Sequence, residues 1–283
     1  MRFPALLWAL LLSACSPIAV LNAFVPEGNL ERTSAIAYGD SPRQRLDVYV
    51  PRRKAAGAAP VVVFFYGGRW QEGERASYLF VAQALVAQGF VVVVPDYRVY
   101  PAVQYPGFIE DGARAVAWTR REIGRFAGDP ARIFLMVHSA GAHIAAMLAY
   151  DEEFLAREGL RRSDVRGFIG LAGPYDFLPL TDADLFGVFS AASPLEATQP
   201  IRYVRGGEPA SLLITGDADT TVKPGNTVRL AARLREKGST VVERHFGSLN
   251  HYTLVARLAA PLRNDALVDT IAAFVRGEAL APR

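Results

Sequence analysis

The stretch RIFLMVHSAGAHIAAMLAY, Arg132 to Tyr150, places one serine between two segments of different pattern. The first segment is a continuous apolar run, which is typical of a strand buried on both faces. The second is rich in Ala and predicts a helix. Ser139 and Gly141 stand where the chain must turn, and a strand, a sharp turn and a helix are the setting in which a serine hydroxyl is exposed as a nucleophile. The amide of Ala140, at the helix start, would then face a developing oxyanion. A serine at this boundary also suits a helix N-cap, so Ser139 alone leaves two interpretations open.

The rest of the chain repeats this alternation of strand and helix patterns. Apolar or period-two runs predict strands at residues 44–51, 60–68, 90–97, 132–137, 165–173, 211–216 and 239–246. Helical patterns lie at residues 78–88, 110–126, 140–149, 227–237 and 265–276. We therefore expect an α/β fold, with a mostly parallel central sheet and helices on both faces. Residues 176–209 show no clear period, and a loop this long tends to be functional or lid-like.

Composition excludes several classes of protein. The chain has 283 residues, of which 51% are hydrophobic, and a formal net charge of +3. Such a composition predicts an ordered globular protein, and the spread of Lys and Arg offers no basic stripe for nucleic acid. No His or Cys cluster has the spacing of a metal site, so we expect neither a metal nor another cofactor.

The first residues differ from the rest of the chain. Residues 3–12 form an apolar run about half the ~20 residues needed to span a bilayer, which predicts an export signal over residues 1–14. The following "LSAC" resembles the lipobox of bacterial lipoprotein signals, and Cys15 is the only cysteine. The resemblance implies lipidation of Cys15 and a tether over residues 15–29. It also implies a membrane-anchored lipoprotein of the cell envelope, with Ser16 favouring the outer membrane facing the periplasm. Because no internal repeat and no segment long enough for a second domain follows, we expect residues 30–283 to form a single α/β domain.

Acid and histidine candidates follow the last two predicted strands, in the order that a serine triad of this architecture requires. "SLLITGDADTTV" offers Asp217 and Asp219 after the penultimate strand. The loop after the final strand carries His251, whereas His245 lies inside that strand, where packing or surface exposure is expected.

The remaining candidates surround the serine. We expect His138 to line the pocket and His143 to be hydrogen-bonded within its helix. The loop "YGGRW" after the predicted strand at residues 60–68 supplies Gly68, and next Arg69, as the second oxyanion donor. Trp70, together with the aromatic and leucine side chains of residues 176–209, suggests an apolar acyl pocket, although simple loop packing explains the same residues.

These motifs together resemble the α/β-hydrolase superfamily over nearly the whole mature chain. The resemblance is strongest to the carboxylesterase branch that holds feruloyl and acetyl-xylan esterases and kynurenine formamidases. It is carried by "YGGRW", "VVPDYRVYP", "HSAGAH", "GPYDF", "GDADTTV" and "LNHYTL". Three positions depart from the family pattern: Val137 replaces the first Gly of Gly-x-Ser-x-Gly, Tyr66 replaces a His, and Arg69 replaces a third Gly.

The resemblance implies a serine carboxylesterase that acts on a small-molecule ester through an acyl-enzyme. The pattern Gly-x-x-Asp-x-x-Val selects Asp219, so Ser139, His251 and Asp219 form the expected triad. One alternative is an amidase or arylformamidase with the same triad. The other is an envelope lipoprotein that uses this fold without catalysis, because a fold does not determine function.

Overall fold

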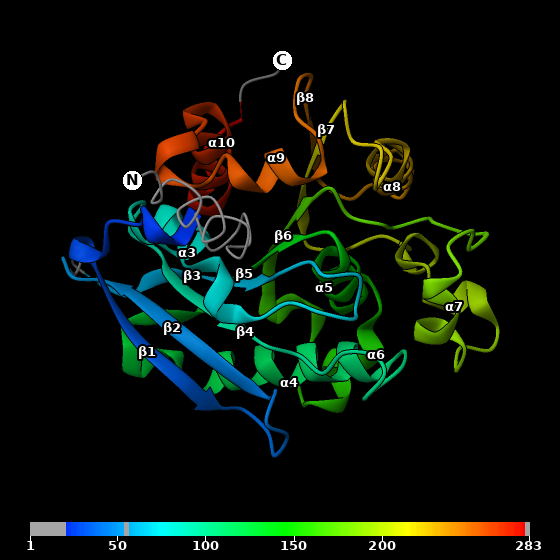
Figure 1. The fold of residues 1–283 in the computed structure, drawn as a ribbon, viewed down its shortest axis with the longest axis horizontal. Coiled ribbons are helices and arrows are strands. Elements are labelled where there is room, and N and C mark those ends of the chain that lie inside the picture. Colours follow the sequence, from blue (N-terminus) through cyan, green and yellow to red (C-terminus); the bar gives the residue numbers. More distant parts are fainter. Residues whose placement is uncertain (1–20, 54–56, 281–283) are drawn as a thin grey trace, which may run out of the picture.

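A computed structural model describes residues 21–53 and 57–280 of the chain. They build one sheet of eight strands with helices packed on both faces (Figure 1). The strand order is β1-β2-β4-β3-β5-β6-β7-β8. The strands are β1 (Leu30–Ala37), β2 (Arg45–Pro51), β3 (Ala59–Phe65), β4 (Val91–Pro95), β5 (Gly128–His138), β6 (Val165–Leu171), β7 (Ala210–Gly216) and β8 (Val241–Phe246).

The sheet is mostly parallel, as the sequence predicts. From β4 to β8 every neighbouring pair runs parallel, whereas β2 pairs antiparallel with both β1 and β4. The seven predicted strands are all present. The pattern missed β1, because this edge strand is largely exposed and lacks the apolar run of a central strand.

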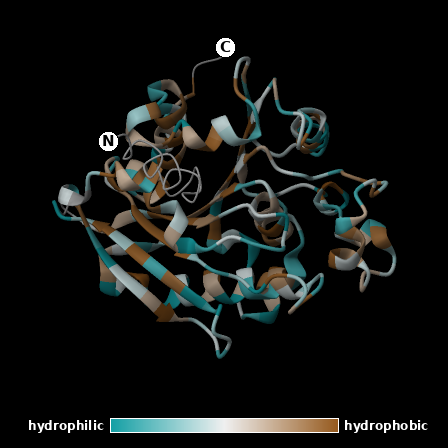
Figure 2. Cartoon of the chain, viewed as in Figure 1, coloured by the Kyte–Doolittle hydropathy of each residue, from teal (hydrophilic) through white to brown (hydrophobic). Residues whose placement is uncertain are grey.

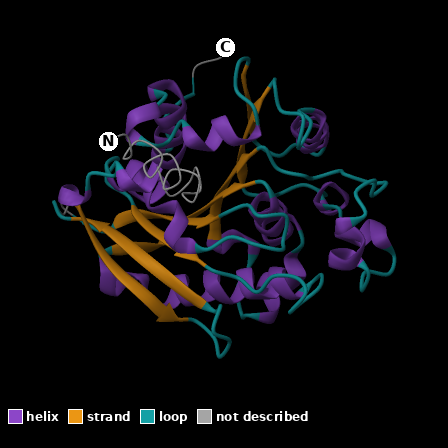
Figure 3. Cartoon of the chain, in the orientation of Figure 1, coloured by secondary structure: helices purple, strands orange, loops and turns teal. Residues whose placement is uncertain are grey.

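Five helices correspond to the predicted helical patterns: α3 (Leu79–Val86), α4 (Gly107–Glu122), α5 (Ala140–Tyr150), α8 (Gly225–Glu236) and α10 (Asp265–Arg276). Helices α3 and α10 contact each other on one face, and α4 and α5 contact each other on the opposite face (Figure 1 and Figure 3). Three six-residue helices were not predicted, because so short a segment shows no period: α6 (Glu152–Arg157), α7 (Asp184–Phe189) and α9 (His251–Ala256).

Seven short 3-10 helices complete the described elements: η1 (Glu27–Asn29), η2 (Arg75–Tyr78), η3 (Ile123–Phe126), η4 (Arg162–Asp164), η5 (Leu195–Thr198), η6 (Pro200–Tyr203) and η7 (Ala260–Leu262). Two of them, η5 and η6, lie with α7 in the segment at residues 176–209 that shows no period in the sequence.

The core follows the central strands, where hydrophobic colouring is concentrated (Figure 2). Every residue of β4 is buried, and so are residues 61–65 of β3, 133–138 of β5 and 167–171 of β6. Burial of a Val or Leu side chain contributes ~2 kcal/mol, so these strands hold the C-terminal edge of the sheet rigidly for the loops that leave it.

The chain before β1 lies against this body from Leu21 onward. Leu21 and Val25 pack on the core, and Asn22 Nδ2 donates a hydrogen bond of 2.9 Å to the carbonyl of Ala76. The expected signal, Cys15 and the first part of the expected tether lie outside the described residues. Within residues 21–53 and 57–280, no helix combines the length and apolarity that a membrane span needs.

Candidate active site

Ser139 occupies the turn between β5 and α5 with φ 56° and ψ −124°. A left-handed backbone is unfavourable for a residue with a side chain, so neighbouring groups must hold it. Its amide donates to the carbonyl of Leu171 at 3.2 Å. Gly141 allows the close approach, because a Cβ there would lie 2.2 Å from the carbonyl oxygen of Phe65. The Ser139 side chain makes no capping hydrogen bond, which removes the N-cap interpretation.

The sharp turn forms with Val137 at the position that is Gly in the family pattern. Val137 is fully buried in β5, in register with Phe65 on one side and Gly170 on the other. The space next to the serine is instead left free by Gly67, where a Cβ would lie 2.8 Å from Ser139 Cβ. The branched side chain therefore does not disturb the backbone at Ser139.

His251 bridges the serine and one carboxylate. Its Nε2 lies 2.8 Å from Ser139 Oγ, and its Nδ1 lies 2.8 Å from Asp219 Oδ2. Both side chains of this His–Asp pair are buried. Because Nδ1 faces a carboxylate, it carries the proton, and Nε2 is left to accept one from the serine.

The second oxygen of Asp219 is held by the backbone of its own loop. Oδ1 accepts hydrogen bonds of 2.9 Å from the amides of Thr221 and Val222. Asp217 lies elsewhere: its Oδ1 is 2.6 Å from Nδ1 of His245, and these two side chains are partly exposed. The structure therefore brings Asp219, and not Asp217, to His251.

His138 lies behind the serine, against the His251 ring at a centroid distance of 4.7 Å. Its Nε2 donates to the carbonyl of His251 at 3.0 Å. Burial, with the nearby His251 ring, lowers its pKa to about 3, so it stays neutral. The sequence placed His138 in the substrate pocket, but the cavity at Ser139 does not include it, because the hydrogen bond turns its ring toward the backbone of α9.

His143 is fully buried one turn into α5. Its Nε2 donates to the carbonyl of Thr198 in η5 at 2.8 Å, so the expected hydrogen bond within its own helix is wrong. The helix carbonyls are already used by the backbone, whereas η5 offers a free one. Burial lowers the pKa of His143 to about 4.

The loop after β3 presents the second group of expected oxyanion donors. Gly68, Arg69 and Trp70 have φ of 136°, 54° and 60°. Gly68 admits no side chain, since a Cβ would lie 2.2 Å from the carbonyl oxygen of Glu72. In the described part of the chain the amides of Gly68 and Arg69 donate no hydrogen bond. Across the site, the amide of Ala140 belongs to the first turn of α5, where no intrahelical acceptor exists.

A buried polar network supports this loop. Tyr66 Oη donates to Asp96 Oδ1 at 2.7 Å, and Arg75 forms an ion pair with Asp96. Arg98 pairs instead with Asp111 at 2.7 Å. Sequence reasoning did not assign these partners, because Arg75 lies 21 residues from Asp96 along the chain.

A cavity of about 460 Å³ opens beside Ser139. Apolar side chains form much of its wall: Trp70, Pro174, Phe177, Leu178, Leu180, Leu185 and Val222. Several of these belong to the long segment after β6, so that segment covers the site. Of its other aromatic residues, Phe189 is buried against Trp70 and Phe186 is 54% exposed outside the cavity.

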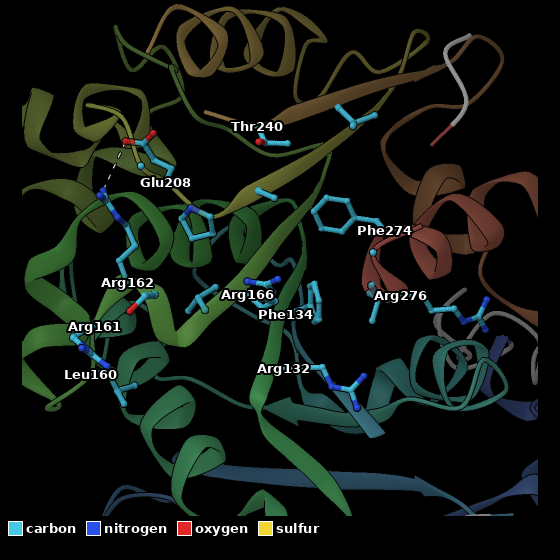
Figure 4. Close-up of a pocket in the computed structure, with 18 of the residues that line it drawn as sticks. Arg132, Phe134, Leu160, Arg161, Arg162, Arg166, Glu208, Thr240, Phe274 and Arg276 are labelled. Atoms are coloured by element: carbon cyan, nitrogen blue, oxygen red, sulfur yellow. Dashed lines mark ion pairs between the residues drawn. The ribbon is translucent and has the colours of Figure 1, made fainter. Parts of the chain in front are cut away.

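A larger cavity of about 980 Å³ lies at the other end of the sheet (Figure 4). Its lining includes Arg132, Val165 and Ala210, which begin or lie near the start of β5, β6 and β7, and Phe274 of α10. It contains no triad residue, so it is not the catalytic cavity. No cluster of His, Cys, Asp or Glu among the residues that the structure describes could hold a metal ion.

With this geometry in place, comparison with known proteins identifies the family. A family model described as BD-FAE matches residues 46–234, which is more than half of the chain. The chain belongs to the BD-FAE family.

Curated relatives of this BD-FAE chain carry esterase names. Isoprenylcysteine alpha-carbonyl methylesterase ICME of Arabidopsis thaliana is 36% identical over 152 residues, which cover 52% of this chain and 35% of the relative. Esterase LipQ of Mycobacterium tuberculosis is 29% identical over 268 residues, which cover 86% of this chain and 62% of the relative. The chain thus spans little more than a third of the length of the plant protein.

Solved structures confirm the α/β-hydrolase fold. Esterase B of Lactobacillus rhamnosis superposes with a TM-score of 0.78 at 20% identity, covering 96% of this chain and 91% of that one. A truncated carbohydrate esterase from gut microbiota superposes with a TM-score of 0.77 at 18% identity, covering 89% of this chain and 98% of that one. At these identities the likeness concerns the fold alone.

Proposed function

We propose that this BD-FAE protein is a serine carboxylic-ester hydrolase that works through Ser139, His251 and Asp219. The observation that carries the proposal is the continuous chain of hydrogen bonds from Ser139 Oγ through His251 to Asp219, with both links at 2.8 Å. A serine hydroxyl is a weak nucleophile until a base accepts its proton, and a histidine oriented by a carboxylate is suited to that task.

Acylation begins with attack of Ser139 Oγ on the ester carbonyl carbon. As the C–O bond forms, His251 Nε2 takes the hydroxyl proton, and Asp219 stabilises the imidazolium. The carbonyl oxygen becomes an oxyanion between the amides of Ala140 and Gly68, a type of contact worth ~3 kcal/mol per donor in the transition state. Collapse of the intermediate breaks the bond to the leaving oxygen, which receives the proton from His251.

Deacylation repeats these steps with water. His251 takes a proton from the water as it attacks the acyl-enzyme, the second oxyanion forms in the same place, and the proton returns to Ser139 Oγ as the acid leaves. His138 contributes by holding the carbonyl of His251 at 3.0 Å, which keeps the catalytic ring at the serine. It touches no reacting atom and is a positioning residue.

The same triad can cleave an activated amide, and one relative supports this second candidate. Kynurenine formamidase of Salmo salar is 30% identical over 148 residues, covering 51% of this chain. Two other relatives, the Arabidopsis methylesterase and the mycobacterial esterase LipQ, have names that favour an ester. The assembled triad favours catalysis over the non-catalytic alternative, and so does the strained backbone at Ser139, because such strain clusters at functional sites.

We also propose that the protein is an envelope lipoprotein anchored through Cys15, possessing the signal motif "LSAC" at residues 12–15. More than one acyl chain on a cysteine gives stable anchoring, since each buried methylene contributes ~0.8 kcal/mol. Labelling of expressing bacteria with an alkyne fatty acid tests this: a Cys15→Ser variant that still takes up label and stays with the membrane would overturn it.

Hydrolysis of p-nitrophenyl butyrate by the purified full chain in detergent tests the proposed activity. We expect turnover by the native protein and a loss of at least ~10³-fold in kcat with Ser139→Ala, because removing the nucleophile leaves only binding and the oxyanion donors. A Ser163→Ala variant, changed in η4 far along the sheet from the triad, is the matched control.

Labelling with a fluorophosphonate probe provides a second readout. Only an activated serine reacts with it, so the native protein and the Ser163→Ala control should be labelled and the Ser139→Ala variant should not. Equal turnover in all three proteins, with folding verified by circular dichroism, would overturn the assignment of Ser139.

A further inference from the structure

The cavity beside Ser139 offers space for one half of the substrate. His251 delivers its proton to the leaving oxygen, so the leaving group must lie next to the His251 ring. The cavity of about 460 Å³ is lined by Ser139 and by Ala140, but not by His251 or by Tyr252 beside it. The nucleophile and an expected oxyanion donor thus form part of its wall, so the acyl carbon is bound at this wall and the acyl chain can lie in the cavity.

Most charges in this acyl cavity neutralise one another. Arg69 lies 2.6 Å from Asp182 and 3.7 Å from Asp184, and Arg229 forms an ion pair with Asp176. Both of these arginines are thereby compensated by carboxylates of the segment that covers the site. They leave no charge for a ligand.

Lys223 is the exception among the cations of the cavity lining. It follows Val222 in the loop of the catalytic acid, and its ammonium has no ion pair or hydrogen bond with any residue that the structure describes. Much of the rest of the lining is apolar, with Trp70 and Phe177 among its residues. A pocket with one unpaired cation and apolar walls suits a carbon chain that ends in an anion.

We propose that the acyl cavity is an anion-selective subsite, in which Lys223 binds a carboxylate at the far end of the acyl chain. The substrate class is then the monoesters of dicarboxylic acids. This inference rests on the proposed ester hydrolase activity and deepens it. The distal carboxylate takes no part in the reaction: the ester bond is cleaved at Ser139 as before, and the carboxylate orients the chain along the cavity.

The experiment compares two esters of equal chain length, p-nitrophenyl hydrogen adipate and p-nitrophenyl hexanoate. Native enzyme should show a higher kcat/KM for the anionic ester, by about fivefold, as for a charge pair near the surface. The ratio should fall to about one with Lys223→Met, return with Lys223→Arg and fall below one with Lys223→Glu. It should also shrink in 0.5 M NaCl, because salt screens exposed charges.

Lys237→Met is the matched control. Lys237 also lies on the surface, but it pairs with Glu236 at the end of α8 and does not line the cavity. This variant should keep both the native ratio and the native rate on the neutral ester.

The outcomes separate the two proposals. Hydrolysis of both esters with a ratio near one, unchanged by Lys223→Met and Lys223→Glu, overturns the anion subsite and leaves the esterase proposal standing. Hydrolysis of neither ester by the native protein overturns the esterase proposal itself. A native preference for the anionic ester that disappears with Lys223→Met and not with Lys237→Met supports both.

Discussion

At the residue scale, the site depends on backbone conformations that few residues adopt without help. Ser139, Arg69 and Trp70 all have positive φ although none is glycine. Each such residue costs ~1–3 kcal/mol and persists only because the surrounding structure enforces its conformation. The surroundings here are glycines that leave room, Gly67 and Gly141, and the result is a serine hydroxyl directed at His251.

The two carboxylates that follow β7 are predicted to behave very differently. Asp219→Asn should lower kcat for p-nitrophenyl hexanoate by ~10³- to 10⁴-fold. The amide that replaces the carboxylate cannot stabilise the charged form of His251, and it favours the wrong tautomer of the neutral form. Asp217→Asn should leave kcat within about twofold, since Asp217 contacts only His245 and lies partly in solvent. Steady-state kinetics at pH 8 measures both. Equal losses in the two variants would contradict the assignment.

At the element scale, the loop that follows β3 is held by side chains from three other elements. Tyr66 Oη bonds to Asp96 after β4, and Arg75 of η2 pairs with Asp96 and, at 2.8 Å, with Asp47 of β2. Burial on its own would raise the pKa of Asp47, but the Ala35 amide and the guanidinium groups of Arg75 and Arg32 lower it instead. Asp47 therefore stays ionised at neutral pH, where it pairs with Arg75. We call Asp47, Arg75, Asp96 and Tyr66 the charged platform of this loop.

Removing the Tyr66 hydroxyl from this platform is expected to loosen the loop that follows β3 and carries Gly68 and Arg69. Tyr66→Phe leaves the buried carboxylate of Asp96 with one donor fewer, which should lower the free energy of unfolding by about 1–3 kcal/mol and reduce kcat more than it changes KM. Tyr78→Phe is the control, because Tyr78 stacks on Tyr66 at 5.2 Å but its hydroxyl has no hydrogen-bond partner in the described structure. Urea denaturation and steady-state kinetics on both variants provide the measurements, and matching losses would argue against a role for the hydroxyl.

The segment that covers the cavity contributes one exposed ion pair to the loop that follows β3. Its ion pair between Arg69 and Asp182 joins side chains that are 44% and 42% exposed. Pairs this accessible contribute less than ~1 kcal/mol. Loss of this ion pair should therefore cost little free energy, whereas Phe189 of the same segment is buried against Trp70.

At the scale of the whole molecule, two buried histidines couple stability to pH. His138 and His143 are neutral in the folded protein, because burial lowers their pKa to about 3 and about 4. In the unfolded chain a histidine has a pKa near ~6.5. Below that pH the unfolded chain binds protons that the folded protein does not. The two histidines therefore leave the free energy of unfolding unaffected above pH ~6.5 and lower it as the pH falls.

We predict that each buried histidine removes about 1.4 kcal/mol of unfolding free energy per pH unit between pH ~6 and the folded pKa. His143→Gln keeps a donor for the carbonyl of Thr198 but does not titrate, so it should reduce this slope by one such increment. Urea denaturation at pH 7, 6 and 5 measures the slope.

His245→Gln is the control for this pH dependence. Burial would lower the pKa of His245, but hydrogen bonds with Glu243 and Asp217 raise it above its usual value. His245 therefore stabilises the folded protein at low pH, and this stabilisation is lost as the pH rises through the folded pKa. Its removal should not make the acid slope shallower. An unchanged slope in His143→Gln would show that His143 is not buried in its neutral form.

The amino-acid sequence by itself determined the features that depend on neighbouring residues. Apolar runs of strand length and helices of periodic pattern predicted seven of the strands and the five longer helices, because burial on both faces or on one face shapes composition locally. The turn at Ser139 was predictable for the same reason: an apolar strand, a small residue after the serine and an Ala-rich helix are adjacent in the chain.

Only the tertiary structure decided which of these residues meet. Ser139 and His251 are 112 positions apart, and two aspartates two residues apart bind different histidines. The hydrogen bond between His138 and His251 and the ion pair between Arg75 and Asp96 likewise join distant segments. The place of Lys223 in the cavity lining also depends on how these segments fold together. A local pattern records whether a side chain is buried, whereas the partner of a polar group is set by how separate loops converge at one edge of the sheet.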